Sequence, residues 1–474
     1  MLYQDTRGGP LVDFPTTLLK GIPENGGLYI PEKWPVFTEN QKRRILRMRR
    51  YTDVAYAVLA PYVDEETRRV LKRLLKRAYT RKKFGSAIVP VKKLDQELFL
   101  LKVSQGPTWA FKDMALQLLG ELLDFWLEKK DRYLNIIVAT SGDTGSAAIE
   151  ALRGKKRISI IVLSPSQGNM SEAQMRQMYG VHDKKVFNII IEGDFDDAQD
   201  ILKAIMRDDA FKNEYMLGLV NSINWSRIIA QTAYFVWAWS RIAKGPDDPI
   251  IFSVPSGNFG DAHGAFGAKM MGIPIEHIIV ATNENDVLDR FFKTGRYDAR
   301  VNEPLAMTDS PSMNIKVASN FERLLAEAFR RNGKMVAHLM SHMGAGANGW
   351  FDISALPEFG YFAKMGFLSD SCSDAQTREA INVAYGRYGV VIDPHTAVAL
   401  RAAWKYPKVG TPIAIVETAL WEKFPATIKE SLGFMPPLSS KYRTLMRRKK
   451  RFVRMEADVE AVKGFIAEKF KKAA

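Results

Sequence analysis

The stretch NIIVATSGDTGSAAIEALRGKKRISIIVL, residues 135–163, contains two β-branched runs, 135–139 and 158–163, separated by a glycine-rich turn and an amphipathic segment. Short apolar runs that alternate with such segments are typical of parallel strands covered by helices on both faces. The pattern recurs at four further runs, residues 187–191, 250–254, 277–281 and 412–416. We therefore predict an α/β fold.

Both ends of the chain differ from this pattern. Residues 41–50 (QKRRILRMRR) and 65–83 place apolar positions at helical spacing among lysines and arginines, which predicts a mainly helical region over residues 1–90. Near the other end, residues 441–454 form a basic cluster that is followed by an amphipathic helix over 456–469. We interpret the basic cluster as a structured surface segment, with a nucleic-acid-binding arm as the alternative.

The composition is that of a globular protein of several domains, with 474 residues, 46% hydrophobic and 26% charged. The formal charge of +15 raises the prospect of a polyanionic partner. A single cysteine, Cys372, excludes an internal disulfide and a zinc site of paired thiolates, and it fits a cytoplasmic protein. Neither a signal peptide nor an apolar run of about 18 residues is present, so we expect a soluble protein.

Two motif-like patterns carry little weight. Gly344, Gly346 and Gly349 satisfy a dinucleotide-binding pattern, but the residues before them read as helix and those after them do not, so we predict a loop. His338 and His342 have the spacing of helical zinc ligands, yet the glutamate that a zinc peptidase needs between them is missing. We therefore expect no metal site.

The turn at residues 140–146 (TSGDTGS) follows a predicted strand and opens a helix. A glycine-rich turn in this position directs backbone N–H groups and the positive end of the helix dipole outward, which suits a carboxylate or a phosphate. The alternative is an ordinary turn with Thr144 as the helix N-cap, and this segment alone leaves both interpretations open.

Residues 253–267 (SVPSGNFGDAHGAFG) again combine a strand, a glycine turn and a helix. Gly257 and Gly260 let the backbone approach an anion closely, and Ser256 and Asn258 add side-chain donors. Two anion-ready turns in one chain indicate a bound phosphate ester.

A third segment, residues 106–119 (GPTWAFKDMALQLL), places Lys112 at the start of an apolar helix. A lysine in this position is usually a surface residue. Here the apolar neighbours indicate a desolvated amine, whose lowered pKa would suit imine formation.

Together, these three segments resemble the threonine synthase family, which consists of pyridoxal-phosphate enzymes of the tryptophan-synthase-β fold type. GPTWAFKD resembles the family's cofactor-lysine segment, TSGDTGSAA its loop beneath the cofactor and SGNFGD its phosphate loop. The resemblance continues through VNSINWSRIIAQ, TNENDVLDRFF, SPSMNI, SNFERLL and DPHTAVAL, and includes the opening TRGG and GLYIPE. It therefore covers nearly the whole chain.

The resemblance implies a fold type II architecture, with two α/β domains of parallel-rich sheets, the cofactor in the cleft between them and an N-terminal helical region. We place the boundaries at 1–90, 91–245 and 246–474, with the cofactor lysine in the second segment and the cofactor-phosphate loop in the third.

The resemblance also assigns roles to individual residues. Lys112 would hold pyridoxal 5'-phosphate and then act as the mobile base. Asp143 would lie near the cofactor's 3-hydroxyl, and Thr418 would face its pyridine nitrogen, where a neutral hydroxyl favours elimination and replacement over transamination. The cofactor phosphate would be bound by Ser256, Gly257, Asn258, Phe259 and Gly260.

For the substrate, O-phosphohomoserine, the resemblance implies two groups of ligands. Its carboxylate would be held by Thr140, Ser141, Gly142 and Thr144. Its phosphate would be held by Ser312, Asn314, Asn320 and Arg323. For residues 319–323 the alternative is a helix start, with Ser319 as N-cap and Glu322 closing a capping box.

Two departures from the family concern positions expected near the active site. Family members usually have histidine at Gln105 and His-Pro at Leu420-Trp421. Alternative functions are therefore a related phospho-lyase or an amino-acid dehydratase that releases 2-oxobutyrate, and outside enzymes a basic nucleic-acid-binding protein on a reused fold. For the enzyme we expect a small-molecule substrate, a monomer or homodimer, and no membrane or nucleic-acid partner.

Overall fold

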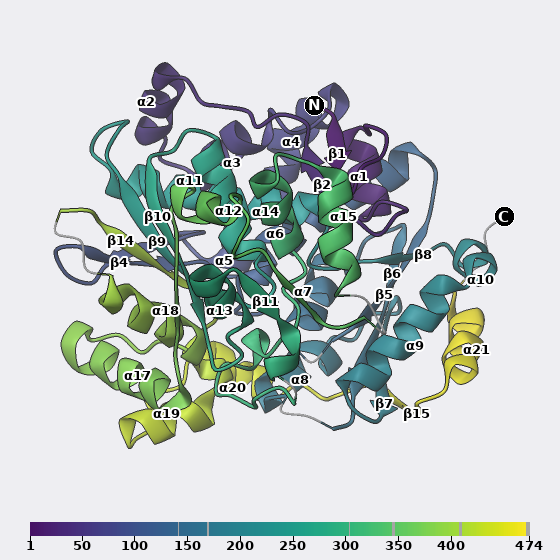
Figure 1. Cartoon of the computed structure of the whole chain (residues 1–474). Helices are drawn as coiled ribbons and strands as arrows, with labels where there is room; N and C mark the ends of the chain where they lie inside the picture. Colours follow the sequence, from purple (N-terminus) through teal and green to yellow (C-terminus); the bar gives the residue numbers. More distant parts are fainter. Residues whose placement is uncertain (141, 168–169, 303, 344–346, 407–409, 471–474) are drawn as a thin grey trace. The chain divides into compact units, whose positions relative to one another are not determined.

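The computed structural model describes residues 1–470 except 141, 168–169, 303, 344–346 and 407–409 (Figure 1). Contacts divide the chain into two compact units. Unit 1 comprises Met1–Gln105 and Ser222–Met435, and unit 2 comprises Gly106–Asn221 and Pro436–Ala474. The units are divided after residues 105, 221 and 435, and not at the predicted residues 90 and 245. The units rest on contacts, whereas the three consecutive domains rest on the resemblance to a family and stay a prediction.

The main sheet of unit 1 has the strand order β13-β10-β9-β14-β4-β3. All neighbours in this order pair in parallel except β3 and β4, which are antiparallel. Its strands are β3 (Val91–Lys93), β4 (Leu98–Lys102), β9 (Ile250–Pro255), β10 (Ile275–Thr282), β13 (Phe367–Ser371) and β14 (Ile413–Glu417). The central strands β9 and β14 are buried along their whole length, which explains their continuous apolar runs.

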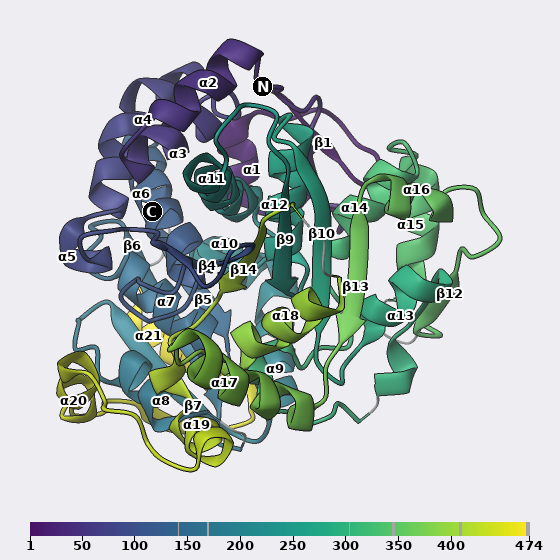
Figure 2. The same cartoon turned by 90° about the vertical axis from the view of Figure 1, so that its left-hand side faces the viewer.

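Helices cover this sheet from within the same unit. Helix α18 packs against β9, β10 and β14, with α17 beyond it (Figure 2). The helices of unit 1 are α1 (Phe14–Lys20), α2 (Glu39–Arg47), α3 (Tyr51–Leu59), α4 (Glu65–Ala78), α5 (Arg81–Phe84), α11 (Trp225–Ile242), α12 (Gly260–Met270), α13 (Val287–Thr294), α14 (Phe321–Ala328), α15 (Gly333–Ser341), α16 (Phe359–Lys364), α17 (Asp374–Tyr388), α18 (Pro394–Lys405) and α19 (Pro425–Leu432). Two antiparallel strand pairs complete the unit, β1 (Tyr3–Asp5) with β2 (Tyr29–Pro31) and β11 (Arg296–Asp298) with β12 (Trp350–Asp352).

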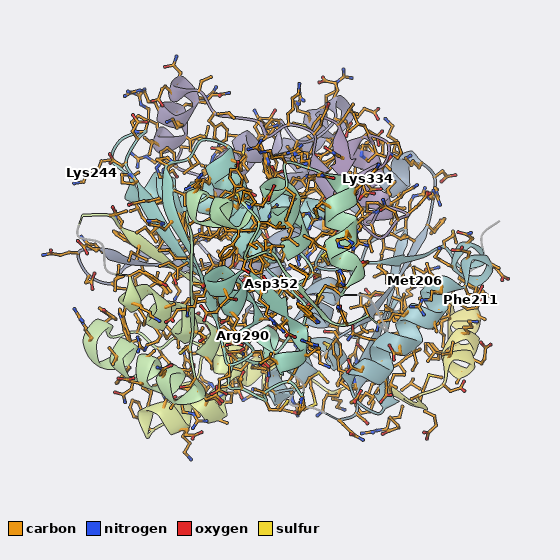
Figure 3. The ribbon with its side chains drawn as sticks, viewed as in Figure 1. Met206, Phe211, Lys244, Arg290, Lys334 and Asp352 are labelled. Carbon is orange, nitrogen blue, oxygen red and sulfur yellow. The ribbon has the colours of Figure 1, made fainter. Side chains whose placement is uncertain are left out.

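Unit 2 is built on a parallel sheet with the order β15-β7-β6-β5-β8. Its strands are β5 (Leu134–Ala139), β6 (Ile158–Pro165), β7 (Val186–Glu192), β8 (Leu217–Leu219) and β15 (Val453–Glu456). Its helices are α6 (Lys112–Lys129), α7 (Asp143–Leu152), α8 (Glu172–Tyr179), α9 (Phe195–Arg207), α10 (Asp209–Glu214), α20 (Ser440–Met446) and α21 (Val459–Lys469). Met206 and Phe211, labelled in Figure 3, pack against the core that the sheet shares with α9 and α21.

The α/β prediction is confirmed, because five of the six predicted runs lie within strands, the sixth lies in β14 except for Pro412, and each of these strands pairs in parallel with a neighbour. The basic segment 441–454 contains nearly all of α20 and the first two residues of β15, so its interpretation as a structured surface segment holds. The predicted helix 456–469 begins later, at Val459, because residues up to Glu456 pair with β7. Among the described residues, none of the helices combines the length and hydropathy that crossing a bilayer requires.

Candidate active site

The lysine segment of unit 2 is a tight turn that is fixed from inside by Asp113. The buried Asp113 carboxylate accepts the Thr108 backbone N–H at 2.7 Å and the Thr108 hydroxyl at 2.9 Å. Gly106 leaves room for this carboxylate, since a Cβ at that position would lie 2.4 Å from Asp113. Trp109 adopts a positive φ of 58°, and Lys112 then begins α6. The turn is therefore shaped to present Lys112 at a helix start.

Two residues that were predicted separately meet in this unit. Lys112 Nζ lies 3.3 Å from Asp143 Oδ2, and the other carboxylate oxygen of Asp143 accepts the Gln174 side-chain N–H at 2.9 Å. The Lys112 side chain is 14% exposed and that of Asp143 is 5% exposed. The Lys112 amine also lies 5.4 Å from the Phe111 ring centroid. The amine thus combines the apolar surroundings expected from sequence with an acidic partner. Gln174 was not predicted, because it lies 31 residues from Asp143 in the chain.

The turn at residues 140–144 is folded around the Thr140 hydroxyl. Its oxygen accepts the backbone N–H groups of Gly142 and Gly145, each at 3.1 Å. Gly142 has φ 148° and is the N-cap of α7, so the alternative with Thr144 as N-cap is wrong; Thr144 lies inside the first helical turn. The N-cap shifts because only glycine adopts this backbone conformation readily. Ser141, a predicted substrate ligand, lies outside the described residues.

The turn at residues 256–260 connects β9 to α12 in unit 1. Ser256 donates its backbone N–H to Ala281 O at 2.8 Å, which fixes the end of β9 to β10. Its hydroxyl is buried and has no hydrogen-bond partner among the described residues. Phe259 takes a left-handed conformation with φ 60° and directly precedes Gly260, the first residue of α12. A buried, unpaired hydroxyl at a helix N-terminus fits a phosphate ester.

Two other segments of unit 1 fix this turn. A Cβ on Gly257 would lie 3.1 Å from Met313 Cα and 3.2 Å from Ser312 O, so the backbone at 312–313 packs directly on the glycine. Asn258 O accepts the backbone N–H and the side-chain N–H of Asn320, both at 3.1 Å. On one side of Gly257, the space left by the missing side chain is therefore occupied by the backbone of residues 312–313.

Two of the residues predicted to bind the substrate phosphate are engaged in this support. Asn320 accepts a hydrogen bond from Arg323, whose other nitrogens donate to Tyr29 O at 2.9 Å and Ile223 O at 2.5 Å. Arg323 is fully buried, and burial lowers the pKa of its guanidinium to about 9. Their role as substrate ligands remains a prediction, while the structure shows them bracing the turn at residues 256–260, which we call the phosphate turn after its predicted ligand.

The capping-box alternative for residues 319–323 is wrong. Helix α14 begins at Phe321 with Asn320 as its N-cap, and Asn320 makes no side-chain cap bond. Glu322 instead accepts the Thr6 hydroxyl at 2.5 Å and the Arg7 guanidinium at 2.8 Å. Ser319 donates its hydroxyl to Asn258 Oδ1 at 3.2 Å. Contacts with segments distant in sequence therefore replace the local capping bonds.

The other two predicted phosphate ligands lie on the neighbouring segment. Ser312 belongs to a 3₁₀ turn over Pro311–Met313, and its backbone N–H donates to His395 Nε2 at 3.1 Å. The Asn314 side-chain oxygen accepts hydrogen bonds from Asn283, Asn285 and Thr308, at 2.8, 3.1 and 2.7 Å. This oxygen is thus occupied by protein donors.

Thr418 is buried directly after β14, next to a carboxylate that the sequence analysis missed. Glu417 Oε1 accepts the Ser104 hydroxyl and, at 3.4 Å, the Gln105 side-chain N–H, while Oε2 lies 3.2 Å from Lys102 Nζ. Burial raises the pKa of Glu417, and the charge of Lys102 opposes this shift. Gln105, one of the two departures from the family, is therefore tied to the strand that precedes Thr418.

The patterns set aside earlier behave as ordinary surface features where the structure describes them. The rings of His338 and His342 lie edge to face with centroids 5.1 Å apart. In the described part of the chain, three or more His, Cys, Asp or Glu side chains do not gather as a metal site would require. Gly344 and Gly346 lie outside the described residues, and Gly349 precedes β12.

Sequence models of three families match the chain. The family described as "Pyridoxal-phosphate dependent enzyme" matches residues 84–411. The families "Threonine synthase N terminus" and "Threonine synthase, C-terminal" match residues 2–79 and 396–466. The three matches together cover nearly all of the chain.

Individual proteins agree with these matches. The chain is 42% identical to a threonine synthase of Methylobacillus glycogenes over 99% of this chain and 100% of the relative. It is 41% identical to that of Corynebacterium glutamicum, with 96% and 95% covered. Among solved structures, a pyridoxal-phosphate-bound threonine synthase from Brucella melitensis matches with a TM-score of 0.94 and 37% identity, covering 99% of each chain.

Proposed function

The chain belongs to the threonine synthase family, and we propose that it converts O-phosphohomoserine and water to L-threonine and phosphate. It is a pyridoxal-phosphate-dependent lyase. The observation that carries the proposal is the pairing of Lys112 with Asp143 at 3.3 Å, where two helices of unit 2 begin. The Lys112 amine thus lies beside Asp143, at the glycine turn over residues 140–146. A base that acts next to a substrate carboxylate would need such an arrangement.

The residues present fit the cofactor. In unit 1, Ser256, Gly257, Asn258, Phe259 and Gly260 would bind its phosphate, where the Ser256 hydroxyl is buried without a partner in the described chain. Thr418 would face the ring nitrogen. In unit 2, Lys112 would carry it and Asp143 would lie near its 3-hydroxyl. When bound, pyridoxal phosphate supplies an electron sink for the negative charge that develops at carbon.

Lys112 performs the proton transfers in this proposal. Its amine takes the proton from Cα of the substrate, gives that proton up to the conjugated system that the bound cofactor would provide, and can then take one from Cβ, so that the bond between Cγ and the phosphate oxygen breaks and phosphate leaves. Asp143, which is held by Gln174, orients the Lys112 amine toward the substrate carbon whose proton it takes. The same amine returns a proton to carbon before water adds at Cβ and threonine leaves.

The substrate ligands follow the two turns. The carboxylate binds at Thr140, Ser141, Gly142 and Thr144, where Thr140 keeps the turn in shape. Ser312, Asn314, Asn320 and Arg323 serve the substrate phosphate. Asn320 and Arg323 also brace the turn at residues 256–260, because Asn320 donates to Asn258 O and accepts a hydrogen bond from Arg323.

A phospho-lyase or dehydratase that releases 2-oxobutyrate is the second candidate, and Gln105 is the observation that favours it. Glutamine keeps a donor and an acceptor where the family usually has a titratable imidazole, and here it donates to Glu417 and Ser104. Without a titratable group near the site, the addition of water at Cβ would be controlled differently. Whether water adds there decides between threonine and 2-oxobutyrate as the product.

The decisive experiment combines a spectrum with product analysis. The purified protein should show the visible absorbance of a protein-bound imine, and Lys112→Ala should lose it together with at least ~10³-fold in kcat. Lys129→Ala, at the exposed end of the same helix, is the matched control and should retain both. A colourless wild type would overturn the cofactor assignment.

Products then separate the two candidate activities. With O-phosphohomoserine, equal amounts of threonine and phosphate support the proposed reaction. Phosphate with 2-oxobutyrate and little threonine would favour the second candidate. Salt-dependent nucleic-acid binding without turnover would favour the non-enzymatic alternative, in which the basic clusters bind a polyanion.

We further propose a cytoplasmic enzyme that acts as a monomer or homodimer without a membrane or nucleic-acid partner. The buried free thiol of Cys372 fits a reducing compartment. Several basic side chains of the C-terminal region are engaged by unit 2 itself: Lys450 lies 3.1 Å from Glu172, and Arg454 lies 2.6 Å from Glu192. Light scattering after gel filtration would establish the number of subunits.

A further inference from the structure

Helix α18 of unit 1 begins with a buried carboxylate and imidazole that the proposed reaction does not use. Asp393 is the N-cap of α18, and its Oδ1 accepts the His395 backbone N–H at 3.0 Å. The same oxygen lies 2.8 Å from His395 Nδ1, and the other carboxylate oxygen accepts the Thr396 hydroxyl. Asp393 is 0% exposed and His395 is 4% exposed. The carboxylate therefore fixes the orientation of the imidazole ring.

The opposite ring nitrogen holds a backbone group from a different segment. His395 Nε2 lies 3.1 Å from the Ser312 backbone nitrogen, which carries a hydrogen and can only donate. The imidazole must accept through Nε2, so its hydrogen sits on Nδ1 and points to Asp393. The hydrogen-bond pattern thus assigns one neutral tautomer, and Asp393 stabilises it.

The segment that His395 holds is the one packed on the phosphate turn. Ser312 O and Met313 Cα would lie 3.2 and 3.1 Å from a Cβ on Gly257, so any shift of this segment alters the space beside the turn. Beyond Met313, the Asn314 side chain is held by Asn283 and Asn285. His395 is therefore the anchor at the Ser312 end of a segment fixed at both ends.

We propose that His395, oriented by Asp393, is a positioning residue that sets the affinity of the phosphate turn for pyridoxal phosphate. It acts through the Ser312 N–H and the backbone contact of residues 312–313 with Gly257. This inference rests on the proposed function, because it assumes that residues 256–260 bind the cofactor phosphate. The competing explanation is packing alone, since the His395 ring also lies 5.1 Å from the Phe424 ring.

Two substitutions of similar size separate these explanations. His395→Gln loses the ring but keeps an oxygen that can accept the Ser312 N–H and an amide that can donate to Asp393. His395→Phe keeps a ring against Phe424 but offers no acceptor, so it removes the hydrogen bond from the Ser312 N–H to position 395. The measurement is the dissociation constant of pyridoxal phosphate, obtained by titrating the cofactor-free full-length protein and following visible absorbance.

We expect His395→Phe to bind the cofactor about tenfold more weakly, as the loss of one buried hydrogen bond implies, and His395→Gln to stay within about threefold of wild type. At saturating cofactor, the kcat of His395→Phe should return to within about twofold of wild type, because the defect lies in cofactor affinity and not in proton transfer. A general loss of folding would not be rescued in this way.

The control is Tyr406→Phe, near the other end of α18. The Tyr406 hydroxyl donates to Ser369 O at 2.7 Å, so its loss also removes a bond between a side chain and a backbone group. This variant should lose stability but bind the cofactor as wild type does. It shows whether damage to α18 alone reaches the phosphate turn.

The outcomes are distinct. A His395→Gln variant that binds the cofactor as weakly as His395→Phe overturns the proposal, as does a folded His395→Phe variant with wild-type affinity. Where His395→Phe fails to fold, His395→Gln decides alone, because packing predicts weak binding and positioning predicts near-normal binding. A wild type that binds the cofactor but makes no threonine would overturn the proposed function and leave this inference standing.

Discussion

The two glycine turns, 140–146 in unit 2 and 256–260 in unit 1, follow one plan in sequence but are stabilised in different ways. In the first, the Thr140 hydroxyl accepts two N–H groups of its own turn, so the loop is closed from within. In the second, support comes from outside, through Asn320 on Asn258 and through residues 312–313 on Gly257. In the turn braced from outside, the Ser256 hydroxyl is buried and has no partner among the described residues, as expected of the phosphate ligand that we propose it to be.

The aspartates that open the two helices differ in the same sense. Asp143 contacts Lys112 through one carboxylate oxygen and Gln174 through the other. Asp261 accepts a hydrogen bond from Tyr234, but its second oxygen is buried without a partner in the described part of the chain. Burial raises the pKa of Asp261 to about 7. The carboxylate at the start of α7 therefore has both oxygens engaged, whereas burial of the one at the start of α12 disfavours its charged form.

The largest effect on stability should come from Gly142→Ala. At φ 148° an alanine is strained, and its Cβ would lie 2.8 Å from Gln174 Nε2, which would push that side chain away from Asp143. We expect a loss of about 2–4 kcal/mol in the free energy of unfolding, measured by urea denaturation of the cofactor-free protein.

Two other glycines sharpen this prediction. Gly154 has φ 76° with open space around its Cβ position, so Gly154→Ala should cost only about 1 kcal/mol of backbone strain. Gly257→Ala meets backbone at 3.1 Å at a glycine whose φ is not in the left-handed region, and should weaken cofactor binding more than stability. Equal losses for Gly142→Ala and Gly154→Ala would show that Gln174 simply moves aside.

The next largest effect on stability should come from Thr140→Val, with a loss of about 1–3 kcal/mol in the free energy of unfolding. Valine has nearly the same shape but accepts no hydrogen bond, so it leaves the Gly142 and Gly145 N–H groups without their acceptor. Thr140→Ser keeps the oxygen and should recover most of the loss in the same denaturation experiment. If serine were as damaging as valine, the methyl group and not the hydroxyl would hold the turn.

Asp261 should make stability depend on pH. Its folded pKa, about 7, lies above the ordinary value of 3.8, so the folded state holds the proton more tightly than the unfolded state. Its contribution is therefore complete below about pH 4 and is lost as the pH rises toward 7. Between pH 5 and 8 the free energy of unfolding of the wild type should fall by about 1–2 kcal/mol more than that of Asp261→Asn.

The control for this titration is Glu128→Gln, which removes an exposed carboxylate of α6. Its pH profile, measured by urea denaturation in the same buffers, should run parallel to that of the wild type. Parallel profiles for wild type and Asp261→Asn would contradict the raised pKa of Asp261.

The smallest change in stability should come from Ser256→Ala. The hydroxyl has no partner in the described structure, so removing it should shift the free energy of unfolding by less than about 1 kcal/mol. Cofactor affinity should nevertheless fall about five- to tenfold in an absorbance titration. Ser253→Ala in β9 is the reverse case, since its hydroxyl donates to Ala399 O at 2.6 Å and its loss should cost stability with unchanged affinity.

Much of the fold could be predicted because its signals are local. Continuous apolar runs marked β5, β6, β7, β9, β10 and β14, since a strand buried on both faces needs apolar residues at every position. Strand β15 was missed, because most of VRME is exposed and the segment becomes a strand only through pairing with β7. The contacts that assign residues 436–474 to the same unit as residues 106–221 are likewise not local, so no pattern along the chain marks them.

The sequence by itself determined the α/β class, the positions of the two glycine turns, the place of Lys112 at a helix start and, through its ordered motifs, the family to which the chain belongs. These depend on residue type and spacing over a few positions, where backbone preferences and helix starts are encoded. Only the tertiary structure decided that Asn320 and Arg323 brace a turn, that Gln174 holds Asp143, and that His395 holds Ser312. The partners of a side chain depend on segments that folding brings together, so its neighbours in the sequence do not specify them.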